Sequence, residues 1–168
     1  MTTNFQLAKK IADHVQLLSV VLKSANVEAK FDPAEIPEQI SLSQVYRAGL
    51  IEADILSNFD KFSVVVEFKF FATEEVGDAV TEEAEEGNVA TLDAAFVLVY
   101  SLPSGLEVEK RCFKHFAEVN GPYNAWPYWR ELVQSVTGRV GLAGVTIPVF
   151  HPRPVDVVDH EASESVEP

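Results

Sequence analysis

The segment KFSVVVEFKFFA, residues 61–72, constrains the fold of this chain more than any other part of its sequence. Apolar and polar side chains alternate along it, which is typical of a β-strand with one face buried and the other open to water. One parity is Phe62, Val64, Val66, Phe68 and Phe70, and the other is mostly polar, with Val65 and Phe71 as exceptions. Because strands of parallel sheets are usually apolar on both faces, this pattern predicts an antiparallel sheet.

Three other segments predict strands beside it, at residues 15–31, 45–55 and 89–102. The first is apolar on both parities, with Leu18, Val20 and Leu22 on one and Leu17, Val21, Ala25 and Val27 on the other. Such a strand needs cover on both faces. Between the first two strands, residues 31–43 carry Pro33 and Pro37, which indicate an irregular crossover because proline lacks a backbone donor and restrains its neighbour.

Helices are predicted at both ends of the chain. Residues 4–13 show short helical periodicity, and residues 107–118 predict a second helix that ends at Asn120-Gly121-Pro122. A third helix opens near Pro127, a residue suited to a first turn, and ends at Gly138 or Gly141. Its apolar stripe is Trp129, Leu132, Val133, Val136 and Val140. The fold class is therefore α+β, a four-stranded antiparallel sheet with C-terminal helices packed on one face.

A chain of 168 residues is long enough for one domain with a substantial core. We place that domain at residues 1–150, with residues 145–150 extended, and expect residues 151–168 to form an acidic, disordered tail. The formal charge is -13, with 26 acidic against 13 basic residues, which argues against nucleic-acid binding. Seven of those acids fall in residues 74–86 and five in the tail, so two predicted loops carry most of the charge.

The sequence indicates a cytoplasmic protein without a metal or other cofactor. One cysteine, Cys112, excludes an intramolecular disulfide and fits a reducing compartment. No segment approaches the roughly 20 apolar residues of a membrane span, and the N-terminus is a poor secretory signal. The acidic residues 74–88 lack the spaced Asp and Gly pattern of a calcium loop, so we interpret them as a solvated connection.

Catalytic motifs are missing from the sequence. It contains no nucleophile elbow, Walker A loop, dinucleotide fingerprint or H-E-x-x-H pair. Cys112 and His115 lie three residues apart on a predicted helix and could be neighbours, but a half-buried thiol beside a surface imidazole explains them more simply. The sequence therefore contains no pattern that supports an enzymatic function.

Aromatic side chains gather in two places, the 61–72 strand and residues 123–129. Phe68, Trp129 and Leu132 are expected to fill the core between sheet and helix. One helical layer covers only one face of a sheet, so the apolar residues of the other parity need another role. They suggest a subunit interface or an apolar binding groove.

Residues 120–131, NGPYNAWPYWRE, followed by Gly138-Arg139 and the extended VTIPVF, resemble the SecB family of export chaperones. Pro127-Tyr128-x-Arg130-Glu131 looks like the helix-opening motif of that family, and the four strands with a proline-bearing crossover after the first fit it independently. The resemblance covers roughly residues 14–150.

The resemblance implies a homotetramer, built as a dimer of dimers, that holds unfolded or precursor polypeptides in apolar grooves without ATP. Burial of apolar surface is non-directional and tolerates many client sequences. The candidate groove lining is Ile36, Ile40, Phe68, Phe70, Phe71, Tyr123, Trp126 and Tyr128. The candidate oligomer interface is Leu17, Val21, Trp129, Leu132 and Val136.

Two departures from the family pattern bear on the partners. Members that dock on the SecA motor carry acids in the first strand, whereas residues 19–23 here have none, which puts SecA docking in doubt. A proline-rich acidic tail also replaces the last helix. Both departures resemble the SecB-like chaperones that accompany toxin–antitoxin pairs, so an antitoxin is a possible partner. The alternative from another class is an adaptor whose apolar surface serves only oligomerisation or one partner.

Overall fold

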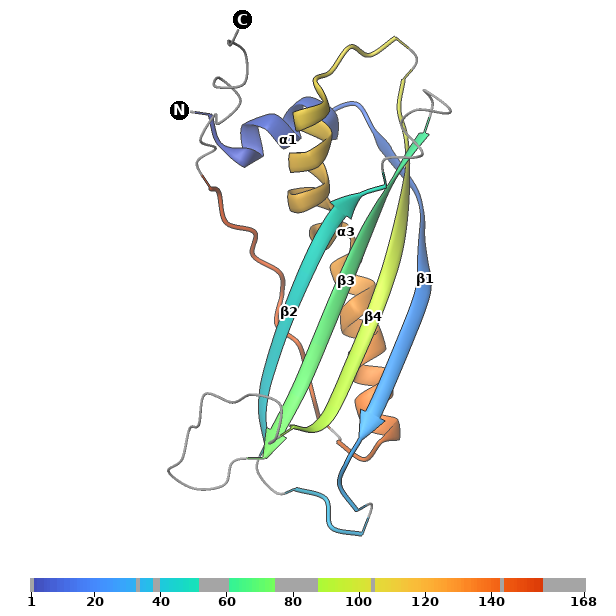
Figure 1. Cartoon of the computed structure of the whole chain (residues 1–168), viewed down its shortest axis with the longest axis vertical. Helices are drawn as coiled ribbons and strands as arrows, with labels where there is room; N and C mark the ends of the chain where they lie inside the picture. Colours follow the sequence, from blue (N-terminus) through green and yellow to red (C-terminus); the bar gives the residue numbers. More distant parts are fainter. Residues whose placement is uncertain are drawn as a thin grey trace, which may run out of the picture.

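The computed structural model describes residues 2–32, 34–37, 40–51, 61–74, 88–103, 105–142 and 144–155. Within these ranges the elements are α1 (Asn4–Ala12), β1 (Gln16–Ala29), β2 (Ile40–Leu50), β3 (Lys61–Glu74), β4 (Asn88–Ser101) and α3 (Lys110–Arg139). The strands stand side by side as one long sheet, with α3 along one of its faces (Figure 1). The predicted α+β class is confirmed.

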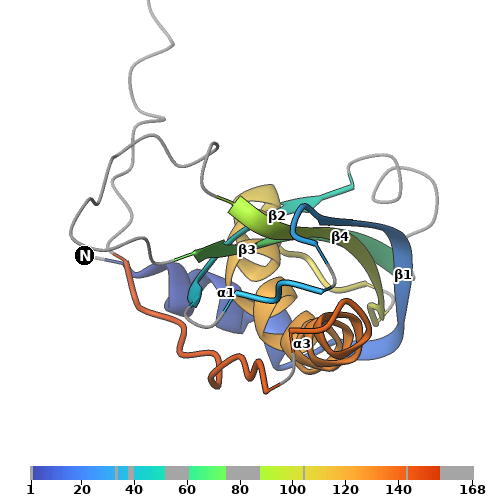
Figure 2. The same ribbon diagram turned by 90° about the horizontal axis from the view of Figure 1, so that it is seen from below.

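The sheet is antiparallel throughout, with the strand order β1-β4-β3-β2. Viewed end-on, the sheet is one layer and α3 lies against one side of it (Figure 2). We call that side the helix face and the opposite side the open face. Phe62 to Phe70 of the predicted parity are buried on the helix face, together with alternate residues of β4. The alternation of residues 61–72 therefore predicted this strand and its buried face correctly.

The two faces of β1 differ from the predicted parities because the strand is irregular at two places. Its register with β4 shifts between Leu17 and Ser19 and again between Leu22 and Ser24. Each shift adds one residue and reverses the alternation of the side chains that follow. As a result Leu17, Val20, Leu22, Ala25 and Val27 share the helix face, opposite Tyr100, Leu98, Phe96, Ala94 and Leu92.

The predicted break at residues 120–122 is wrong, because α3 is continuous from Lys110 to Arg139 and contains both Pro122 and Pro127. Gly121 explains how packing overrides these local signals. A Cβ at this position would lie 2.9 Å from Val64 Cγ1 and 3.2 Å from Val66 Cγ2, so only glycine lets the helix approach β3 this closely. Pro122, the next residue, is fully buried. Two predicted C-terminal helices are thus one.

The second helix of this layer is α1, at the N-terminus. It begins with a capping box, in which the Gln6 N–H donates to Thr3 Oγ1 (3.3 Å) and the Thr3 N–H donates to Gln6 Oε1 (2.9 Å). Its buried residues, Leu7, Ala8 and Ile11, join the core cluster, and the helix packs against α3. The predicted helix at residues 4–13 is confirmed.

Residues 144–155 follow α3 and return along it; we call this segment the strap. It leaves the helix through Gly141 and Gly144, whose φ angles of 95° and 86° suit glycine. In Figure 1 the strap, drawn in red, runs beside β2 toward α1. At its far end the Asn4 N–H donates to the Val155 carbonyl (3.0 Å) and the Val155 N–H donates to Asn4 Oδ1 (2.9 Å). The rest of the predicted tail, residues 156–168, lies outside the described residues.

None of the described helices is both long and apolar enough to span a membrane. Across the same part of the chain, no group of three His, Cys, Asp or Glu residues is arranged to hold a metal ion. Of the acidic connection predicted at residues 74–88, Glu74 and Asn88 belong to β3 and β4, and residues 75–87 lie outside the described ranges, as does the end of the second predicted strand at residues 52–55.

Candidate functional site

Five aromatic side chains meet where β2 faces α3; we call them the aromatic cluster. They are Tyr46 of β2, Phe68 of β3, Trp126 and Trp129 of α3, and Phe150 of the strap. Phe68 stacks on Trp129 with ring centroids 5.0 Å apart and an interplanar angle of 9°. Tyr46 meets Phe68 at 6.1 Å and Trp126 at 6.5 Å. The cluster joins one edge of the sheet to the helix.

The strap covers the outer side of this cluster. Phe150 lies 4.9 Å from the Trp126 ring and 5.4 Å from the Tyr46 ring, centroid to centroid. The Trp126 indole Nε1–H donates to the Pro148 carbonyl at 2.9 Å, and Arg130 Nε donates to the Ile147 carbonyl at 2.9 Å. Beneath the strap, Trp129 Nε1–H donates to Gln44 Oε1 at 3.1 Å. Val145 and Ile147 of the strap are buried. This chain's own extended segment therefore occupies the cluster.

The structure brings together only part of the predicted groove lining. Phe68 and Phe70 lie in the core on the helix face, 1% and 2% exposed, so as described they offer no surface to a ligand. Phe71 is opposite Ser43 on the open face and belongs to another surface. Trp126 joins the aromatic cluster but is covered by the strap.

The remaining predicted lining residues make no ring contact with the cluster in the described structure. Tyr123 and Tyr128 are exposed on α3. Ile36, also exposed, lies against the base of the strap, where a Cβ on Gly141 would be 3.3 Å from Ile36 Cδ1. Ile40 is partly buried and packs against the core. The crossover therefore meets the chain just after the end of α3, at Gly141.

The predicted interface residues also differ in how far they are buried. Trp129 is fully buried within its own chain, which corrects its assignment to a contact between subunits and confirms its expected place in the core. Leu132 and Val136 are partly buried and pack against the core, as does Leu17. Val21 is 51% exposed on the open face. Of the five, Val21 is the one that the structure leaves open.

Val21 is one of four exposed apolar residues on β1, which together we call the β1 surface although they lie on both of its faces. Leu18, Leu22 and Val27 are exposed as well, although Leu22 and Val27 project to the helix face. Helix α3 packs mainly on β2, β3 and β4, and the four residues of this β1 surface stay exposed. The sequence signal for this surface was that both parities of the strand are apolar. From this we expected both faces of the strand to be covered. The described part of the chain does not supply that cover.

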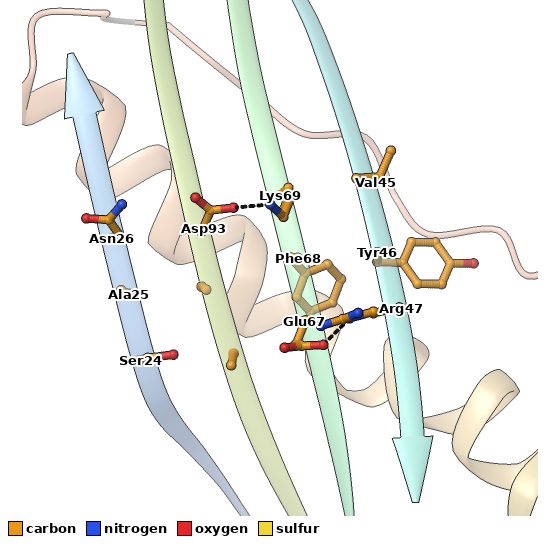
Figure 3. Close-up of a pocket in the computed structure, with 12 residues that line it drawn as sticks. Ser24, Ala25, Asn26, Val45, Tyr46, Arg47, Glu67, Phe68, Lys69 and Asp93 are labelled. Atoms are coloured by element: carbon orange, nitrogen blue, oxygen red, sulfur yellow. Dashed lines mark hydrogen bonds and ion pairs between the residues drawn. The ribbon is translucent and has the colours of Figure 1, made fainter. Parts of the chain in front are cut away.

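The open face carries a hollow of about 480 Å³ across all four strands (Figure 3). Two ion pairs cross its floor, Arg47 with Glu67 and Lys69 with Asp93, the latter at 3.3 Å. The hydrogen bond from Arg47 lowers the pKa of the Glu67 carboxyl and raises that of the Arg47 guanidinium. The acids of this surface are therefore matched by bases.

Candidate catalytic groups are not brought together in the described residues. The Cys112 thiol is fully buried, and His115 Nδ1 lies 3.1 Å from Glu118 Oε2 on the same helix. Burial raises the pKa of the Tyr100 hydroxyl to about 12, and the hydrogen bond from Asn124 Nδ2 opposes this shift. A phenol held neutral inside the core is a structural group.

Sequence reasoning missed four residues at this site: Gln44, Tyr46, Arg130 in its role toward the strap, and Phe150. A signal for the first two was present, since Ile40, Leu42, Gln44, Tyr46, Ala48 and Leu50 occupy one parity of β2. Placing the start of the strand at residue 45 hid this alternation. Arg130 lay within the quoted helix-opening motif, but nothing local shows that its partner is a carbonyl 17 residues later.

Comparison with known proteins gives matches in structure alone. No protein-family model matches the sequence, and no curated protein does. The SecB-like chaperone Rv1957 of Mycobacterium tuberculosis, solved in complex with a ChAD peptide from the HigA1 antitoxin, is similar with a TM-score of 0.71 and 17% identity over 88% of this chain and 98% of that chain. A protein of unknown function from Streptococcus agalactiae is similar at a TM-score of 0.41 and 14% identity, covering 80% of this chain and 96% of that chain.

The similarity to Rv1957 extends over nearly all of that chain, so the fold of this protein is that of a SecB-like chaperone. The fold implied by the sequence resemblance is thereby confirmed.

Proposed function

We propose that this protein is an ATP-independent chaperone of the SecB-like type, not an enzyme, which holds unfolded polypeptides in the cytoplasm. The observation that carries this proposal is the aromatic cluster at the junction of β2 and α3, covered only by an extended segment on its outer side. Aromatic surface binds apolar side chains by burial, at about 25 cal/mol per Å², and needs no particular client sequence.

The fold supports the same proposal. Rv1957 shares this fold and was solved with a bound peptide from an antitoxin. A peptide ligand suits the chain described here, since an extended apolar segment already lies on its aromatic cluster. The client groove that we propose is the space along Tyr46, Trp126 and Arg130 that opens when the strap leaves.

We further propose that the protein assembles as a homotetramer, a dimer of dimers. β1 is an edge strand of 14 residues with exposed Leu18, Val21, Leu22 and Val27. A long apolar edge of this kind favours pairing with another chain. A second copy of β1 would extend the sheet and bury these side chains, and contacts through Leu132 and Val136 of α3 would join two dimers.

A dedicated antitoxin chaperone is the second candidate, favoured by the antitoxin peptide bound to Rv1957. Delivery to SecA has less support, because two of the open-face acids, Glu67 and Asp93, are paired with Arg47 and Lys69. The adaptor alternative would use the same surfaces for one partner alone. Client breadth separates these functions.

The test is suppression of aggregation. Two proteins unrelated in sequence, thermally unfolded citrate synthase and chemically unfolded rhodanese, are diluted into buffer with the purified chain, and light scattering is followed. A general chaperone suppresses both at near-stoichiometric ratios without ATP. Suppression of neither, with tight binding of one antitoxin segment, would assign the dedicated role instead. Albumin at equal mass is the control for crowding.

A further inference from the structure

The strap is held as a bound peptide is held, although it belongs to the chain. It runs extended, and between Gly144 and Pro154 no backbone–backbone hydrogen bond joins it to the described part of the chain. Its contacts are of two other kinds: apolar side chains that enter the interior, namely Val145 and Ile147, and carbonyl oxygens that accept from side chains of α3. Neither kind depends on the strap's being covalently continuous with the helix.

The side chains of Trp126 and Arg130 donate to main-chain carbonyl groups, which every polypeptide has. Trp126 Nε1 and Arg130 Nε donate to consecutive residues, through the carbonyls of Pro148 and Ile147, each at 2.9 Å. Both donors lie on α3, four residues apart, and so on one side of the helix. A donor aimed at a main-chain carbonyl fixes the position of an extended chain without reading its side chains. Next to them, the rings of Trp126 and Tyr46 receive one aromatic side chain, Phe150.

We propose that residues 144–155 are a displaceable self-ligand. On this proposal, which rests on the chaperone function proposed above, a client replaces the strap, takes over the hydrogen bonds from Trp126 and Arg130, and places an apolar side chain where Phe150 lies. The strap keeps Trp126 buried and covers part of Tyr46 while no client is present, which limits exposed apolar surface.

Both ends of the strap have features that favour its separation from the rest of the chain. At one end Gly141 and Gly144 have φ angles of 95° and 86°, so the chain turns there at residues with little steric restriction. At the other end Asn4 and Val155 exchange two hydrogen bonds at an exposed position. Between them Thr146, Pro148 and Val149 face solvent. Release therefore breaks few contacts beyond Val145, Ile147, Phe150 and the two carbonyl bonds.

Hydrogen exchange of the full-length protein tests displacement directly. The probe is reduced, carboxymethylated α-lactalbumin, which stays unfolded in native buffer. On the proposal, saturation with the probe speeds exchange of the Val155 and Asn4 amide hydrogens, whose hydrogen bonds tie the far end of the strap to α1, while α3 near Trp126 stays protected. Unchanged or slower exchange in the strap would overturn the proposal, because the client would then bind elsewhere or over the strap.

Affinity of the same probe, labelled with a fluorophore and measured by anisotropy, gives the second test. Phe150→Ala removes the ring from Trp126 and Tyr46 and should tighten probe binding about five-fold, a change of the size expected from one lost aromatic contact. Asn4→Ala, which weakens the far anchor from outside the aromatic cluster, should tighten it less. Val149→Ala is the matched control, since its side chain is 62% exposed on the same segment and should leave affinity unchanged.

The outcomes distinguish this proposal from the function on which it rests. If wild type and variants bind the probe equally and strap exchange does not change, the chaperone function stands and the self-ligand is rejected. If no variant binds the probe, the chaperone function fails, and the self-ligand fails with it. A synthetic peptide of residues 143–152 should also compete with the probe, and its Phe150→Ala form should compete less well.

Discussion

The two edges of the sheet differ in how their apolar side chains are covered. β2 lies against α3, and its Tyr46 and Gln44 contact Phe68, Trp126, Phe150 and Trp129. β1 makes little contact with α3, and its Leu18, Val21, Leu22 and Val27 remain exposed. The chain thus packs α3 and the strap against β2, although Leu42, Val45 and Tyr46 of that strand stay exposed, and α3 makes little contact with β1.

The difference shows what each edge is suited to bind. An edge covered by a separable segment can exchange that segment for another peptide, whereas an edge exposed along 14 residues of β1 suits a permanent partner of the same length. We therefore assign client binding to the β2 side and assembly to the β1 side. Changes on the β2 side should alter the fold or the client, and changes on β1 should alter the subunit count.

The largest effect is expected at the centre of the covered side. Trp129→Ala removes a fully buried ring stacked on Phe68 and leaves Gln44 without its donor. The free energy of unfolding should fall by about 3–5 kcal/mol, measured by urea denaturation. Tyr128→Ala on the same helix, at an exposed ring, is the control and should change it by less than about 0.5 kcal/mol. Equal losses of unfolding free energy in the two variants would contradict the placement of Trp129 in the core.

Next in size is a change of assembly from the open edge. Val21→Asp places a charge on the exposed β1 surface and should weaken self-association about 100-fold or more, since burying an unpaired carboxylate is costly. Light scattering should then show a smaller particle than the wild type's, which we expect at about four times the 18.6 kDa chain mass.

The matched control for assembly is Val45→Asp, which adds the same charge at an exposed valine of the opposite edge strand, also on the open face. It should leave the particle mass unchanged. If Val45→Asp dissociates the assembly and Val21→Asp does not, the two edges have been assigned the wrong way round. A monomeric wild type would contradict the proposal that β1 mediates assembly.

A smaller effect is expected from alkaline pH, on the part of the core next to β1. Tyr100, opposite Leu17, has its pKa raised to about 12 by burial. An unfolded tyrosine ionises near pH 10, so between about pH 10 and 12 the unfolded state loses its proton first, and stability falls by about 2–3 kcal/mol. Denaturation curves at several pH values measure this loss. Tyr100→Phe should lack this component, and an identical alkaline loss in that variant would refute the assignment.

Sequence patterns predicted those parts of the fold that local periodicity determines. The alternation from Phe62 to Phe70 gave β3, its buried face and the antiparallel class, because a half-buried strand must alternate. The predicted faces of β1 were wrong, since two register shifts at Leu17/Ser19 and Leu22/Ser24 depend on the partner strand and leave no trace in composition. Continuity of α3 depended likewise on the close approach of Gly121 to Val64, a tertiary contact.

The candidate site was harder to predict than the fold for a related reason. Trp126 was selected because aromatic residues cluster near it, but Phe68, Phe70 and Phe71 were selected as one group although strand alternation sends Phe71 to the opposite face. The contacts of Trp126 and Arg130 with the strap join residues 22 and 17 positions apart and have no periodic signature. Long-range contacts of this kind become visible only in the folded chain.

The central claim, that clients bind on the helix-face side of β2, is tested most directly by photo-crosslinking from two adjacent residues. Tyr46 and Val45 are both exposed, but they project to opposite faces of β2. A photoreactive amino acid is placed at one position or the other, and the protein is irradiated with labelled, carboxymethylated α-lactalbumin. We predict a strong crosslink from position 46 and little or none from position 45. A crosslink confined to position 45, or equal at both, would contradict the assignment of client binding to the aromatic cluster.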